Sequence, residues 1–224
     1  MSTPSGPSLR QLTTPRAAAL AGVVFAVLFS AVLILIRTKM PEGLRDTAGW
    51  LDQERGAITV ATVLMPFAGI SFLWFIGVVR DRLGRYEDRF FATVFLGSGV
   101  LFLAMMFVAT AVAEGLVASN SGVIDSAAHG EVIDFGKMVV LAASKTYALR
   151  MAAVFMISLA TIWRKTGVMP RWLVGLSYLV AVALLIITEI SMWVTLAFPV
   201  WVLVVSGWIL AHSRQIDQLR AGHE

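Results

Sequence analysis

Cysteine is absent from this 224-residue chain, and histidine occurs only three times. The absence of thiols excludes disulfides, thiolate catalysis and cysteine-ligated metal centres. His129, His212 and His223 lie in a predicted outer loop, at a helix end and in the C-terminal tail. No pair of buried imidazoles is therefore expected for haem or zinc. We predict no cofactor and no bound metal.

The motifs of the common hydrolases are missing as well. A nucleophilic serine needs a neighbouring base, and no histidine lies in the interior of an apolar segment. The HExxH motif of zinc proteases does not occur. We predict no enzymatic activity, although a mechanism based on a carboxylate or a lysine stays open.

Charged residues are scarce, at 14% of the chain, whereas 58% of the residues are hydrophobic. A water-soluble core this rich in apolar residues is not expected. The net charge of +4 comes from Lys and Arg residues at the ends of apolar runs, not along one polar face. We interpret this basicity as a signal of membrane topology and predict no nucleic-acid partner.

Long uncharged runs indicate membrane spans, since about 20 residues cross roughly 30 Å of hydrocarbon. The run 172–213 is about twice as long as one crossing and holds a single formal charge, Glu189, so it must fold back near 188–193. We predict an all-α fold, a polytopic membrane helical bundle over 17–213 with tails at 1–16 and 214–224. The six predicted transmembrane helices are 17–36, 57–79, 90–113, 138–163, 172–188 and 194–212.

The charges in the predicted loops give the orientation. The link "WRKTGVMPR" (163–171) has three basic residues and no acid, whereas the loop from Glu114 to Lys137 has four acids and one base at its end. Because Lys and Arg are enriched on the cytoplasmic side, we expect both termini in the cytoplasm. The sequence thus predicts a multi-pass protein of a bacterial plasma membrane.

The most charged of the short links lies between the second and third spans. Its segment "GVVRDRLGR" (77–85) resembles the signature loop of major facilitator transporters. The matching positions are Gly77, Asp81, Arg82, Gly84 and Arg85. The resemblance implies a tight turn at glycine and charges that bind neighbouring helix ends; the alternative is an ordinary basic cytoplasmic turn.

A broader resemblance covers most of the chain. The stretches "FLWFIGVVRDRLG", "EDRFFATVFLGSG" and "YALRMAAVFMIS" are similar to a family of small bacterial integral membrane proteins that lack an assigned activity. This resemblance implies the six-span fold and no particular function.

Arg150 is the charge that this topology makes most costly. Counting back from Arg164 places it about 21 Å into the membrane, some 9 Å beneath the outer boundary of a roughly 30 Å core. One interpretation is an ion pair with Glu189 or Glu114 that ties spans together. Two alternatives are a vestibule for an anion and a contact with lipid headgroups. The vestibule would be lined by Arg150, Lys145 and Tyr147.

Two prolines lie within uncharged runs, Pro66 in the second span and Pro199 in the sixth. Each removes the backbone hydrogen bond to a threonine four residues earlier, so we expect both helices to kink. The freed carbonyls could serve as ligands for a substrate, and the alternative is a role in packing.

Two functions remain for such a bundle. The first is a small transporter or solute-binding membrane protein, and the second is a non-catalytic structural or regulatory subunit of a membrane complex. The expected partners are the lipid bilayer and either a second copy or another membrane protein. A transporter requires a wet cavity around Arg150 and the kinked helices, whereas a subunit can be dry throughout.

Overall fold

The computed structural model describes residues 14–39, 49–83, 89–119, 126–167, 169–187 and 192–221. Within these ranges the chain is helical except for the link between Thr166 and Arg171. The predicted all-α fold is confirmed for this part of the chain. The predicted tail up to residue 13, most of the predicted turn at 188–193 and the last three residues lie outside the described residues.

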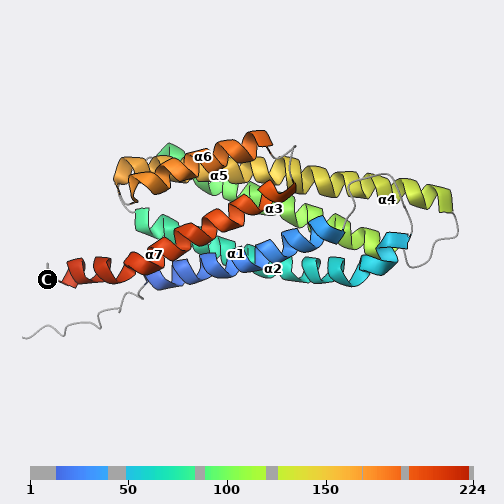
Figure 1. Ribbon diagram of the computed structural model, residues 1–224, viewed down its shortest axis with the longest axis horizontal. Helices are drawn as coiled ribbons and strands as arrows, with labels where there is room; N and C mark the ends of the chain where they lie inside the picture. The colour runs from blue at the N-terminus through green and yellow to red at the C-terminus, as the bar shows by residue number, and fades with distance from the viewer. Residues whose placement is uncertain are drawn as a thin grey trace, which may run out of the picture.

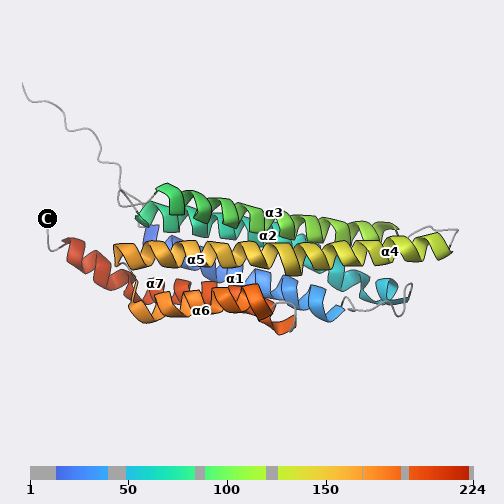
Figure 2. The ribbon, with the colours of Figure 1, turned by 90° about the horizontal axis from the view of Figure 1, so that it is seen from above.

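The helices follow one another along the chain with short links (Figure 1). Their bounds are α1 Thr14–Lys39, α2 Gly49–Leu83, α3 Arg89–Ser119, α4 Ser126–Leu141, the π-helix η2 Ala142–Ala148, α5 Leu149–Thr166, α6 Arg171–Ile187, the 3₁₀-helix η3 Met192–Leu196 and α7 Ala197–Ala221. Since α4, η2 and α5 follow without a break, they form one long rod (Figure 2).

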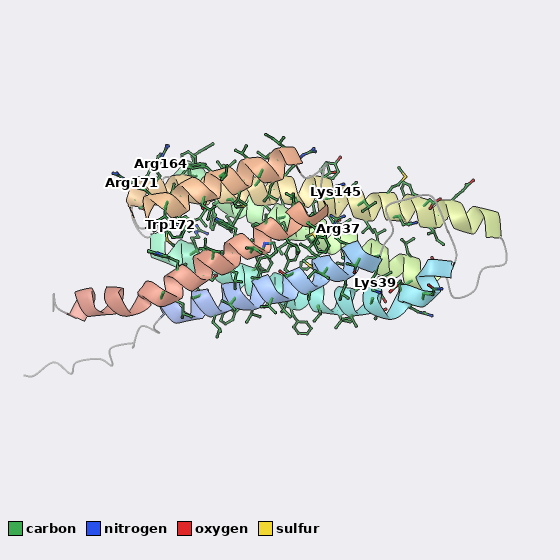
Figure 3. All side chains as sticks on the ribbon, in the orientation of Figure 1. Arg37, Lys39, Lys145, Arg164, Arg171 and Trp172 are labelled. Carbon is green, nitrogen blue, oxygen red and sulfur yellow. The ribbon has the colours of Figure 1, made fainter. Side chains whose placement is uncertain are left out.

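The helices run side by side along the long axis of the molecule and form a closed bundle (Figures 1 and 2). α1 packs between α2 and α7, α3 packs between α2 and α5, and α6 packs between α5 and α7. Arg164, Arg171 and Trp172 lie at one end, which we call the basic end, whereas Arg37 and Lys145 lie toward the other, the far end (Figure 3).

Within the described residues, five helical stretches are long and apolar enough to cross a membrane. They are Ala19–Lys39, Gln53–Arg80, Phe90–Ser119, Gly130–Thr166 and Trp193–Ala211. A sixth apolar helix, Arg171–Ile186, is shorter, about 24 Å at 1.5 Å per residue. The chain is therefore a membrane-embedded helical bundle.

The prediction of a loop from Glu114 to Lys137 was wrong. α3 continues to Ser119 and α4 already begins at Ser126. The two helices approach so closely that a Cβ on Gly136 would lie 2.5 Å from Leu116 Cδ2. Their facing sides bury apolar residues, which stabilises helix here although the acids of this stretch suggested a loop.

The helices are unequal in length, and this gives the far end its shape. α2 has 35 residues and α3 has 31, whereas α6 has 17. At 1.5 Å per residue α2 is about 52 Å long and α6 about 25 Å. α2, α3 and the rod formed by α4, η2 and α5 consequently extend beyond the tip of the α6–α7 hairpin (Figure 2).

Candidate functional site

The centre of the bundle is filled by aromatic side chains from five helices. Phe25 of α1 lies 4.5 Å from Phe72 of α2 between ring centroids, and Phe102 of α3 lies 4.9 Å from Phe198 of α7. These four side chains are fully buried. The remaining members of this aromatic core are Phe29, Phe75, Phe95, Phe155 and Trp201. Rings at 4.5–7 Å are in van der Waals contact, so the middle of the bundle is packed and apolar.

Two hydrogen bonds connect α6 to its neighbours beside the aromatic core. Trp201 Nε1 donates to Ser177 Oγ over 2.8 Å, and Ser177 Oγ donates to the Leu173 carbonyl over 2.7 Å. The hydroxyls of Thr161 and Tyr178 lie 2.7 Å apart. These polar groups satisfy one another within the bundle, and buried polar groups so paired contribute to a single packing arrangement.

A second group of polar side chains lies toward the far end. Arg37, at the end of α1, is only 6% exposed, and its Nη2 donates to Ser144 Oγ over 3.4 Å. Ser144 itself lies in the π-helix η2 and donates to the Val140 carbonyl over 2.6 Å. The contact therefore joins α1 to η2, and π-helical turns are frequent at functional sites.

Glu114 and Lys137 lie on the facing helices α3 and α4 at the same end. Lys137 is 4% exposed, and its Nζ lies 3.9 Å from Asp134 Oδ1. Glu114 Oε2 is buried and has no hydrogen-bond partner within the described ranges. Together with Arg37 and Ser144, these residues form what we call the far-end polar layer.

Most of this layer was not predicted from the sequence. Arg37 follows the first predicted span and Lys137 ends the predicted loop, so both were expected outside the membrane core. No local pattern marks them as buried, because burial results from α4 packing on α3 and from α1 continuing to Lys39.

A small groove borders Arg37 where η3 crosses α1. Trp193, Thr195 and Leu196 line it on one side, and Leu33 and Ile34 line it on the other. Its internal volume is about 10 Å³, which is room for about one water molecule. The groove is too small for an organic solute.

Arg150, which the sequence places within the membrane core, lies on the surface of the bundle. Its side chain is exposed, as is that of Tyr147, whereas Lys145 is half-buried. Behind them Leu149 and Ala153 are fully buried. Two of the three predicted vestibule residues thus lie on the exposed surface of the bundle, and the outward-facing vestibule stays a prediction.

The structure does not bring Arg150 and Glu114 together. α3 and α5 are antiparallel, and a Cβ on Gly99 would lie 3.1 Å from the Phe155 ring. From this contact Arg150 is level with about residue 104 of α3, so Glu114 is ten residues, or roughly 15 Å, farther along the axis. Glu189 lies outside the described residues, and its pairing with Arg150 stays a prediction.

The predicted loop motif is only partly within the described residues. Gly77 lies in α2 on its exposed face, with open space where a Cβ would be. Asp81 and Arg82 belong to the last turn of α2, and their side chains are outside the described part. Gly84 and Arg85 lie between α2 and α3, outside the described residues.

The two prolines occupy different positions. Pro66 is inside α2, on its exposed side, and the helix continues through it. The nearby Thr62 hydroxyl donates to the Ile58 carbonyl over 2.8 Å. Pro199 is buried in the first turn of α7, directly after η3, where a missing N–H removes no bond within the α-helix.

Comparison with known proteins adds no relative: no protein-family model, no curated protein and no solved structure matches this chain.

Proposed function

We propose that this chain is a non-catalytic structural or regulatory subunit of a membrane complex. The observation that carries the proposal is the aromatic core, which fills the middle of the bundle with fully buried rings from α1, α2, α3, α5 and α7. A transport pathway would need water or solute to pass between these helices. Interiors packed to this degree resist such opening, because rings in contact must separate first.

The proposal includes a topology with six crossings and both termini in the cytoplasm of a bacterial-type plasma membrane. It is supported by Arg164, Lys165 and Arg171 at the basic end, which fits the positive-inside rule. Trp172 and Trp193 are more than half exposed at opposite ends of the α6–α7 hairpin, as expected for aromatic residues at the two membrane interfaces. The short α6 crosses if the bilayer thins slightly around it.

A small transporter or solute-binding protein is the second candidate. The far-end polar layer favours it, because Arg37, Glu114 and Lys137 are charged groups within an otherwise apolar bundle. Intramembrane ionisable residues often mark solute pathways. The same residues also suit a subunit, in which they fix how α1, α3 and α4 pack.

Cysteine labelling separates the two functions, because the chain has no native thiol. Ala153 and Met156 are fully buried behind the far-end surface, and Gln53 is exposed on α2. We expect a membrane-impermeant maleimide to label Gln53→Cys in intact cells and to leave Ala153→Cys and Met156→Cys unlabelled. All three should react after denaturation in detergent. Labelling of Met156→Cys in intact cells would instead support transport.

A further inference from the structure

The rod of α4, η2 and α5 is longer than the membrane is thick. Its apolar stretch Gly130–Thr166 has 37 residues, about 55 Å at 1.5 Å per residue, whereas the hydrocarbon core is roughly 30 Å thick. A tilt of about 20°, the average for membrane helices, shortens the crossing by only a few ångströms. Since Arg164 and Lys165 lie at the basic end, the excess lies at the far end, where α4 projects beyond the other helices (Figures 1 and 2).

The outer side of α4 carries large apolar side chains, although this helix extends out of the membrane. Val132, Phe135 and Met138 are 54%, 70% and 65% exposed, and Val139 beside them is half-buried. On the opposite side of the helix Ile133 is fully buried against the bundle. We call the outward set the α4 stripe: Val132, Phe135, Met138 and Val139.

The neighbouring helices expose no comparable residues at this height. The close approach of Gly136 to Leu116 places α4 level with the last turns of α3. Among the described side chains, the large exposed hydrophobic residues of α3 end at Val108, and those of α2 begin only at Val60. Beyond Val108, α3 exposes alanine, glycine and serine. An exposed apolar patch outside the lipid is typical of a contact with another protein.

The α4 stripe is uncharged. Lys137 is 4% exposed, and its Nζ lies 3.9 Å from Asp134 Oδ1, so these two charges face each other and not the stripe. Glu131 is exposed at the edge of the stripe. The matching surface is therefore apolar and lies at the same height above the bilayer. A second copy of this chain presents such a surface, because all copies cross the membrane in the same orientation.

We propose that the α4 stripe pairs with the same stripe of a second copy. A closed pair in one membrane has its two-fold axis along the membrane normal, so the two α4 helices run parallel and Phe135 faces the same residue of the other copy. Val132, Phe135 and Val139 have the alternating spacing of three and four residues that is typical of parallel helix pairs. One helix face is a small interface compared with the usual value of about 800 Å² per partner, so the dimer is reversible. The pairing goes beyond the proposed function and is compatible with a subunit or a transporter.

Disulfide cross-linking tests the pairing, because the chain has no native cysteine. The full chain is produced in cells, and the isolated membranes are treated with copper phenanthroline. We expect Phe135→Cys to give a product of twice the mass on a non-reducing gel, because cysteines that face each other across a two-fold axis come within disulfide distance. Val139→Cys, about one turn along the stripe, should give the same product.

The matched control is Ala118→Cys, which is exposed on α3 at a similar height and outside the stripe. It should remain a single chain, although its thiol reacts with an impermeant maleimide. Equal cross-linking of Phe135→Cys and Ala118→Cys would overturn the proposal, because random collision would explain both. So would the absence of the product in Phe135→Cys while its thiol reacts with the maleimide.

The affinity of the dimer gives a second measurement. Energy transfer between donor-labelled and acceptor-labelled chains is followed in liposomes as the ratio of protein to lipid falls. We expect Phe135→Asp to raise the dimer Kd at least about tenfold, because it removes an apolar contact from both copies and brings two like charges together. Ala118→Asp should leave the Kd unchanged. Both positions are exposed in the single chain, so neither change disturbs the bundle, and an unchanged Kd in Phe135→Asp would count against the pairing.

Photo-cross-linking identifies the occupant of the stripe. A benzoylphenylalanine residue in place of Phe135 is irradiated in the producing cells, and the adducts are identified by mass. A cross-linked pair of this chain supports the proposal, whereas adducts with lipid alone or with a different protein alone would overturn it in favour of that occupant. The labelling of Met156→Cys, which tests the proposed function, does not depend on α4, so failure of one proposal is distinguishable from failure of the other.

Discussion

Gly99 and Gly97 are both glycines of α3, but only Gly99 lies in a close helix contact. A Cβ on Gly99 would lie 2.8 Å from Ile76 Cδ1 and 3.1 Å from the Phe155 ring, whereas a Cβ on Gly97 would meet open space. Both glycines are on α3, two residues apart, so one faces α2 and α5 and the other faces outward. Small residues at such contacts let membrane helices approach closely.

We expect Gly99→Leu to destabilise the protein by about 1–3 kcal/mol, the usual cost of overpacking a core. Gly97→Leu should change stability by less than about 0.5 kcal/mol, as an outward substitution does. Reversible unfolding in mixed detergent micelles, followed by circular dichroism, measures both. Similar losses for the two variants would contradict the close contact at Gly99.

The π-helix η2 is an element that the sequence pattern did not predict. Ser144 faces Arg37 of α1 from within it, and the helix continues from α4 into α5 on either side. A turn closed by i→i+5 hydrogen bonds is wider than an α-turn and changes which side chains face inward. Here Ser144 and Ala148 point into the bundle while Tyr147 and Arg150 point outward.

The contact between Arg37 and Ser144 allows a test of how η2 is held against α1. Ser144→Ala removes an acceptor from a buried guanidinium and should lower the free energy of unfolding by about 1–3 kcal/mol. Ser98→Ala is the matched control, because Ser98 is also buried and its hydroxyl donates to the Val94 and Phe95 carbonyls of its own helix. It should cost less than Ser144→Ala by the same unfolding measurement, and a reversed order would argue against a stabilising contact.

For the whole molecule, the number of crossings depends on α6. At about 25 Å it is shorter than each of the five candidate spans within the described residues, and it lies between the basic link before Arg171 and the residues that lead to η3. If α6 crosses, its two ends lie on opposite sides of the membrane. Trp172 and Trp193 mark these ends and are equally exposed, at 58% and 57%.

We expect Trp193→Cys to react with an impermeant thiol reagent added to intact cells and Trp172→Cys to react only after the membrane is permeabilised. The reason is the cytoplasmic placement of the basic link, which follows from the distribution of Lys and Arg. Labelling of both variants from the same side would contradict six crossings. Labelling of Trp172→Cys alone in intact cells would reverse the orientation.

The sequence by itself determined those features of the protein that are local along the chain. Apolar runs of about 20 residues set the positions of the helices, because each helix satisfies its own backbone hydrogen bonds in the membrane. The membrane-embedded, all-helical class follows from these runs. So does the placement of Trp172 and Arg171 together at one helix end, since they are neighbours in sequence.

Only the tertiary structure decided which side of each helix faces inward. In a membrane both the lipid-facing and the packed sides are apolar, so hydrophobic periodicity does not distinguish them as it does in water. Arg37 is therefore buried and Arg150 exposed, although each is a lone arginine beside apolar residues in the sequence. The aromatic core and the wider turn at η2 likewise depend on contacts between distant segments, which no local pattern encodes.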